Sequence, residues 1–199
     1  SLIMKHGTPE QKDRWLPRLA SGELRGCLSL SESDAGSDTR NVACRAERDG
    51  EEYVITGTKM WVTNGERAGI VALAARTDEG ITCFIVEKEP GPTFGGITVS
   101  RNIGKLGYKG IETVEMVYDE HRVDAGCVLG GDEGLGHGLG FILGALEVGR
   151  INIAARACGV ARVAFEHAIR YAQERETFGK PIAQHQLIQQ KLADMGTQL

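Results

Sequence analysis

The order of polar and apolar positions first predicts a helix near the start of the chain. Thr8, Pro9 and Gln11 have the pattern of a capped helix start: threonine caps, proline fits the first turn, and glutamine completes a capping box. Gly22 is placed to end this helix. The apolar positions recur at helical spacing and form one face, made of Trp15, Leu16 and Leu19.

From about residue 25 to residue 130 the pattern changes to short β-rich runs separated by turn signals such as Asp49-Gly50. The runs expected to form strands cover residues 42–48, 53–63, 69–75, 81–87, 97–99 and 113–118. Several short strands at this spacing favour an antiparallel sandwich or barrel over βαβ units.

Residues 130–140 contain six glycines, but their spacing does not match the GxGxxG pattern of a dinucleotide-binding turn. A Rossmann loop is therefore not expected. We expect a flexible connector, or a place where the backbone closely approaches a neighbouring segment.

Small and apolar residues then recur every three or four positions from Ile142 to Ala168, which predicts a long helix. A turn at residues 177–181 leads into a second helix, and the two are typical of a helical bundle. The chain is thus expected to be an α+β multidomain segment of a longer protein. Its expected parts are the tail of an N-terminal helical domain (1–24), an antiparallel β-sandwich or barrel middle domain (25–130) and the first long helices of a C-terminal helical bundle (131–199).

Composition narrows the function classes only a little. With 41% hydrophobic and 25% charged residues the chain is ordinary for a globular protein, and a net charge of −4 without a basic run argues against nucleic acid. No uninterrupted run of eighteen apolar residues is present, so no membrane span is expected. The five cysteines form no CxxC pair, which favours reduced thiols in a cytosol-like compartment and no metal site.

The candidate chemistry lies in residues 28–38, LSLSESDAGSD. Cys27 to Leu30 predict a buried strand end, and a hydroxyl-rich turn broken by Gly36 follows. Such a loop places backbone N–H groups and hydroxyls close together, which suits a planar ligand with alternating donors and acceptors, or an anion. Taken alone, the loop favours the simpler interpretation of an ordinary polar turn after a strand.

Three spaced motifs resemble those of the acyl-CoA dehydrogenase family of flavoproteins. Residues 28–38 resemble its first signature, and residues 59–65 (KMWVTNG) its second flavin-contacting strand. Residues 175–182 (RETFGKPI), followed by His185 and Gln186, resemble the motif of its C-terminal helices. The similarity extends over essentially the whole chain.

The resemblance implies an FAD enzyme that forms a double bond between Cα and Cβ of an acyl-CoA thioester, a base taking the α-proton while flavin N5 takes a hydride. The residues implied to contact the flavin ring are Leu28, Ser29, Leu30, Ser31, Ser37, Trp61, Val62 and Thr63. Those implied to hold the FAD diphosphate and adenosine, reaching to a neighbouring subunit's cofactor, are Arg175, Thr177, Phe178, His185 and Gln186. Those implied to contact the acyl-CoA are Ser37, Glu147 and Arg150.

The catalytic base is not expected within these residues. Most family members carry a base glutamate later in the sequence, and a minority place it immediately before the arginine that corresponds to Arg150. That position is Gly149 here, and Glu147 is turned about 200° around the helix from it.

The resemblance further implies electron-transfer flavoprotein as the electron acceptor, a homo-oligomer, and a cytoplasmic location, or the mitochondrial matrix in a eukaryote. Two other functions stay open at this point. One is a non-catalytic scaffold that keeps the flavin fold, and the other is a related flavoenzyme such as a nitroalkane oxidase.

Overall fold

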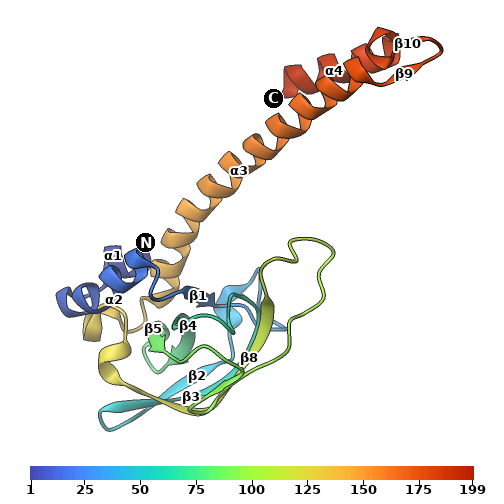
Figure 1. Cartoon of the computed structure of the whole chain (residues 1–199). Helices are drawn as coiled ribbons and strands as arrows, with labels where there is room; N and C mark the ends of the chain where they lie inside the picture. Colours follow the sequence, from blue (N-terminus) through green and yellow to red (C-terminus); the bar gives the residue numbers. More distant parts are fainter. The chain divides into compact units, whose positions relative to one another are not determined.

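The computed structural model describes all 199 residues, which form two compact units, Ser1–Ala145 and Leu146–Leu199 (Figure 1). The first unit holds two short helices, α1 (Leu2–His6) and α2 (Pro9–Ser21), together with the main sheet. The long helix α3 (Gly138–Glu174) begins in the first unit and continues into the second. The expected division into three domains, at residues 24 and 130, stays a prediction.

The predicted start and end of α2 are confirmed. Thr8 Oγ1 accepts from the Gln11 backbone N–H at 3.2 Å, and Gln11 Oε1 accepts from the Thr8 N–H at 3.1 Å, which closes the capping box. Gly22 ends the helix in the left-handed conformation, at φ +79°. The Gln11 amide also donates to the carbonyls of Gly126 and Val128, at 2.9 and 2.7 Å. The cap therefore joins α2 to the segment that follows the sheet.

Eight strands form the main sheet, in the order β1-β4-β2-β3-β8-β7-β6, with β5 paired to β4 (Figure 1). Their bounds are β1 (Gly26–Ser29), β2 (Arg45–Asp49), β3 (Glu52–Thr63), β4 (Ile70–Thr77), β5 (Gly80–Glu87), β6 (Thr93–Phe94), β7 (Ile97–Val99) and β8 (Thr113–Asp124). Each predicted strand is present, and β8 runs six residues further than expected.

The expected middle β domain is confirmed, and most of its strand pairs are antiparallel, but two pairs are parallel. Strand β1 pairs with β4 in parallel, Gly26 opposite Ile70, and β2 meets β4 in parallel at one position, Arg45 opposite Arg76. A parallel pair needs a long crossover connection, and here it is supplied by the loop after β1 together with the β2–β3 hairpin. The sheet is therefore mixed.

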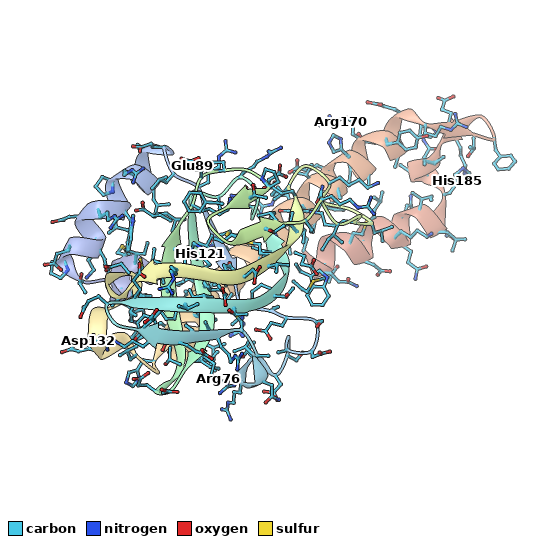
Figure 2. All side chains as sticks on the ribbon, turned by 90° about the horizontal axis from the view of Figure 1, so that it is seen from below. Arg76, Glu89, His121, Asp132, Arg170 and His185 are labelled. Carbon is cyan, nitrogen blue, oxygen red and sulfur yellow. The ribbon has the colours of Figure 1, made fainter.

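One apolar core fills the interior of this unit, built from side chains of most strands. Its largest fully buried members are Tyr118, Phe84, Ile55, Leu73 and Met116. His121 on β8 is also buried (Figure 2), with Nδ1 bonded to the carbonyl oxygen of Gly95 in the β6–β7 hairpin. This bond fastens the short hairpin at the edge of the sheet.

The glycine-dense segment makes the close backbone approaches that its composition predicts. Three short 3₁₀ turns occur in the first unit, Thr39–Asn41, Ala125–Cys127 and Gly131–Gly134. After the last of them, a Cβ at Gly136 would lie 2.4 Å from the Glu79 carbonyl oxygen, and one at Gly138 would lie 2.1 Å from the Cys83 backbone nitrogen. Both glycines are thus needed because the start of α3 passes directly over β5.

The second unit consists of two helices joined by a small hairpin, as the pattern predicts. After α3 the chain forms β9 (Glu176–Thr177) and β10 (Lys180–Pro181), then a 3₁₀ turn (Ile182–Gln184) and α4 (Gln186–Gln198). Phe178 and Gly179 make the hairpin turn with φ values of +52° and +76°, the combination of a type I′ turn. Near the end of α4, a Cβ at Gly196 would lie 3.0 Å from the Phe165 ring on α3, so the two helices pack closely there.

Helix α3 bears on the expectation that the chain contains no membrane span. By length and composition alone it could cross a membrane, with a mean hydropathy of 1.3 over its most apolar eighteen residues. The sequence has no uninterrupted apolar run of that length, because occasional charged residues interrupt the apolar residues of α3. One such helix is weak evidence for a span, because core helices of soluble proteins have the same composition.

We predict opposite effects of one substitution at two neighbouring glycines of α3. Gly138→Ala should lower the free energy of unfolding by about 1–3 kcal/mol, because the methyl group overlaps backbone atoms of β5. Gly140→Ala has open space and should raise it by up to about 1 kcal/mol through helix propensity. Urea unfolding followed by tryptophan fluorescence reports this unit, since both tryptophans lie in it. Equal effects at both positions would contradict the packing argument.

Candidate functional site

The first two motifs lie side by side in the structure. The Met60 backbone N–H on β3 donates to the Ser31 carbonyl at 2.8 Å, and the Lys59 ammonium donates to the Leu30 carbonyl at 2.9 Å. The loop that follows β1 is therefore bonded to the very strand that carries Trp61. This arrangement agrees with the expectation that both motifs contribute to one site.

A β-bulge decides how β3 presents its side chains. The pairing of β3 with β8 shifts between Lys59 and Val62, and Trp61 has a positive φ of +57°. Side chains of a regular strand alternate, so residues 59 and 61 would point the same way. The bulge separates them: Lys59 has no exposed surface, while Trp61 is 52% exposed. A large aromatic surface thus stands free beside the loop.

Some of the predicted residues could contact a ligand only through their backbone. Ser29 is fully buried, and its hydroxyl accepts from the Tyr118 hydroxyl at 3.1 Å; Leu30 and Val62 are buried in the same way. Leu28 and Ser31 are half-buried, and Ser37 and Thr63 are exposed. The side chains free to meet a ligand are therefore those of Ser37, Trp61 and Thr63, with Ser31 in part.

An ion pair that the sequence motifs did not predict lies beneath this surface. Lys59 Nζ lies 2.8 Å from Glu32 Oε1, and both side chains are almost fully buried. The same carboxylate accepts from the Ala43 N–H at 2.6 Å and the Cys44 N–H at 3.0 Å. One signal in the sequence could have indicated this pair. Side chains alternate along a strand, and Lys59 falls on the same side of β3 as the buried residues Tyr53 and Ile55.

The Glu32 carboxyl is held in its charged form by these contacts. Burial acts to raise its pKa, but the hydrogen bonds from Lys59, Ala43 and Cys44 and the lysine charge outweigh burial, so the pKa is lowered from its ordinary value of 4.5. The Glu32 group is thus a carboxylate across the physiological range.

The second set of predicted residues is gathered at one end of the second unit. Thr177 Oγ1 and His185 Nε2 are hydrogen-bonded at 3.1 Å, and the Phe178 ring meets the His185 ring edge-on at 6.2 Å (His185 is marked in Figure 2). Phe178 is 95% exposed at the hairpin turn, and Arg175 and Gln186 are exposed beside it. The Ile182 N–H donates to the Arg175 carbonyl at 2.8 Å, which closes the hairpin on this group. An always-charged guanidinium carried next to the hairpin that holds an imidazole and an aromatic ring is suited to an anionic, ring-bearing ligand.

Helix α3 carries the residues expected to meet the acyl-CoA. Glu147 and Arg150 are both exposed on it. Gly149 has open space where a side chain would begin, so packing does not require a glycine there. Because the segment is helical, Glu147 points about 200° away from position 149, as expected.

Each unit thus offers a surface of its own chemical character. In the first unit, an exposed tryptophan beside a loop of hydroxyls and backbone amides is suited to a planar ring system. In the second unit, the arginine and the histidine are suited to an anion.

Comparison with known proteins identifies the family. Models of the acyl-CoA dehydrogenase N-terminal, middle and C-terminal domains match residues 1–23, 27–121 and 136–199. The chain belongs to the acyl-CoA dehydrogenase family.

Three similar proteins illustrate the match. The mitochondrial 2-methylacyl-CoA dehydrogenase of Solanum tuberosum is 40% identical over 202 residues, which cover 99% of this chain and 47% of that protein. A glutaryl-CoA dehydrogenase from Mycobacterium smegmatis, solved in complex with FADH2, is 40% identical with a TM-score of 0.90, covering 98% of this chain and 49% of that one. A structure described as the electron transferring flavoprotein of Acidaminococcus fermentans is 33% identical with a TM-score of 0.91, covering 98% and 51%. The chain spans about half the length of the curated relatives it matches.

We predict that Glu32→Gln removes an acid-dependent part of the stability of the first unit. A carboxyl with a lowered pKa stabilises the fold above its unfolded-state pKa, and this stabilisation is lost as pH falls through the folded-state pKa. At pH 7 the variant should lose about 3–5 kcal/mol, because Lys59 is left buried without its partner. The difference between the two proteins should shrink below about pH 4.5. Urea unfolding from pH 3 to pH 8 tests this, and a difference that does not change with pH would contradict it.

Proposed function

We propose that these residues form the flavin-binding part of an FAD-dependent acyl-CoA dehydrogenase that converts an acyl-CoA thioester to the trans-2-enoyl-CoA. The observation that carries the proposal is Trp61, held exposed on a bulged strand that is hydrogen-bonded to the residue 30–38 loop. Family membership supports the same assignment.

The residues of the first unit fit the flavin ring. The Trp61 side chain would supply an aromatic surface against the ring system, and the exposed Thr63 hydroxyl, two residues further along β3, would bond near its reactive nitrogen. Backbone N–H groups near Ser31, with its hydroxyl, would bond the pyrimidine edge. Donors at that edge favour the ring when it becomes negatively charged on reduction. When bound, FAD would accept the hydride that leaves Cβ of the acyl chain.

The residues of the second unit fit the other end of the cofactor. Arg175 offers a planar, permanently charged donor to the diphosphate, and His185 and Gln186 offer polar contacts to the adenosine. The hydrogen bond between Thr177 and His185 holds the imidazole in place before any ligand binds. In the assembled enzyme we assign this group to the cofactor of a neighbouring subunit, which makes a homo-oligomer part of the proposal.

The proposed base lies outside these residues. A base on α3 would have to stand immediately before Arg150, and that position is Gly149. Arg150 and Glu147 are instead assigned to the acyl-CoA, Arg150 near its thioester or pantetheine arm, together with Ser37. A carboxylate from elsewhere in the whole protein would take the α-proton.

Electron-transfer flavoprotein is the proposed electron acceptor, which is supported by the similar chain in the Acidaminococcus fermentans structure of that description. We propose a cytoplasmic location, or the mitochondrial matrix in a eukaryote, as in the potato relative.

The visible spectrum of the purified whole protein tests the proposal. A bound flavin should give its yellow absorption, and anaerobic titration with butyryl-, isovaleryl- and longer acyl-CoAs should bleach it for the true substrate class. A colourless protein that binds no added FAD would contradict the flavin assignment. A yellow protein that no acyl-CoA bleaches would favour the scaffold, and one bleached by nitroalkanes alone would favour a nitroalkane oxidase.

The Glu147→Gln variant separates substrate binding from base catalysis. We expect the KM for the acyl-CoA to rise several-fold and kcat to stay within about threefold, because Glu147 faces away from the base position. Steady-state kinetics with an artificial electron acceptor measure both constants. A fall in kcat of about a thousandfold would show that Glu147 is the base.

A further inference from the structure

Two parts of the candidate flavin surface belong to strands that are not neighbours in the sheet. The loop 30–38 follows β1, Trp61 lies on β3, and β4 and β2 stand between them in the strand order. Ordinary ladder pairing therefore does not set the position of one part relative to the other. Some other interaction has to do so.

The Lys59 ammonium provides this interaction. It is fully buried and donates at 2.9 Å to the Leu30 carbonyl and at 2.8 Å to Glu32, so it holds the loop at two points two residues apart. Between these two points, the Ser31 carbonyl accepts from the Met60 N–H at 2.8 Å. The loop is thus bonded to β3 at three successive residues, through the backbone carbonyls of Leu30 and Ser31 and the side chain of Glu32.

Glu32 extends the connection to a third segment. Its carboxylate accepts from the backbone N–H groups of Ala43 and Cys44, just before β2. The Glu32 N–H and the Ala35 carbonyl are bonded at 2.9 Å, which turns the loop back on itself. Both ends of the segment from residue 30 to residue 44 are therefore held by one buried ion pair.

The bulge places this connection directly beneath the exposed surface. Lys59 points into the interior two residues before Trp61 points out of it. A movement of Lys59 would move the start of the bulge, and with it the orientation of the tryptophan.

We infer that Lys59, paired with Glu32, is a positioning residue that sets the loop backbone at residues 30–32 against Trp61 and so shapes the surface for the flavin ring. It touches neither the cofactor nor the substrate and acts through the two segments it joins. The inference rests on the proposed function for its ligand, and on the loop geometry for its mechanism.

The test is the double variant Lys59→Met/Glu32→Gln in the whole protein. Made together, the two changes remove both buried charges, so neither is left without a partner and the variant is expected to fold. Hydrogen exchange of the protein without cofactor should become at least tenfold faster at residues 30–35 and 59–62, and remain unchanged in β4 and β5. The Kd for FAD should rise at least tenfold, with a shifted flavin absorption maximum.

A matched control separates positioning from general destabilisation. Phe84→Leu removes packing volume from the same core, on β5, without touching the pair. At an equal loss of melting temperature it should leave exchange of residues 30–35 and the flavin spectrum unchanged. The single variant Lys59→Arg keeps the charge and can donate to both Leu30 and Glu32. It should therefore bind FAD more tightly than the double variant does.

The outcomes distinguish the two proposals. If the unsubstituted protein binds no FAD, the proposed function fails, and the exchange of residues 30–35 still decides whether Lys59 positions the loop. If the double variant shows exchange in the loop like that of the unsubstituted protein, or binds FAD within twofold of it, the inference is wrong. Equal effects in Phe84→Leu would also overturn it.

Discussion

A lysine with no exposed surface, bonded to a glutamate that is also buried, holds the first unit together where its sheet alone does not. Removing both charges from water costs free energy, and the cost is offset only if the remaining donors and acceptors are satisfied. Here they are: the carboxylate accepts from one ammonium and two backbone amides, and the ammonium also meets a carbonyl. A pair of apolar residues would fill the same space with less desolvation. It would leave the Leu30 carbonyl and the Cys44 amide without partners in the interior.

The parallel pairing of β1 with β4 makes such a connection necessary. It carries the chain across the sheet, so that the loop after β1 must return to β2 through residues that have no ladder partner. Where the loop enters the interior, its backbone groups need partners from side chains. Glu32 and Lys59 supply them, which is why a lysine occupies a position that the alternation of β3 assigns to the core.

The sequence predicted local features well. The capping box at Thr8, the strands and the two long helices depend on neighbours within a few residues, and all were confirmed. The parallel β1–β4 pair was missed because it joins segments more than forty residues apart. The exposure of Trp61 does not follow from the alternation of β3, which places this side chain in the interior beside Lys59, and only the resemblance to a flavin-contacting motif implied it. A bulge is a property of the pairing with β8, which only the fold reveals.

The backbone of Trp61 has an unfavourable conformation. A bulky residue at φ +57° is strained, with a cost on the order of 1–3 kcal/mol, and glycine would avoid that cost. The strain persists because Lys59 on one side and Val62 on the other are both held in the interior. What the conformation achieves is exposure of an indole that the core would otherwise bury. Since exposing a large aromatic surface lowers stability, both costs fall at a single residue. The stability of the first unit explains neither cost, and the proposed flavin would offset the second by covering the indole.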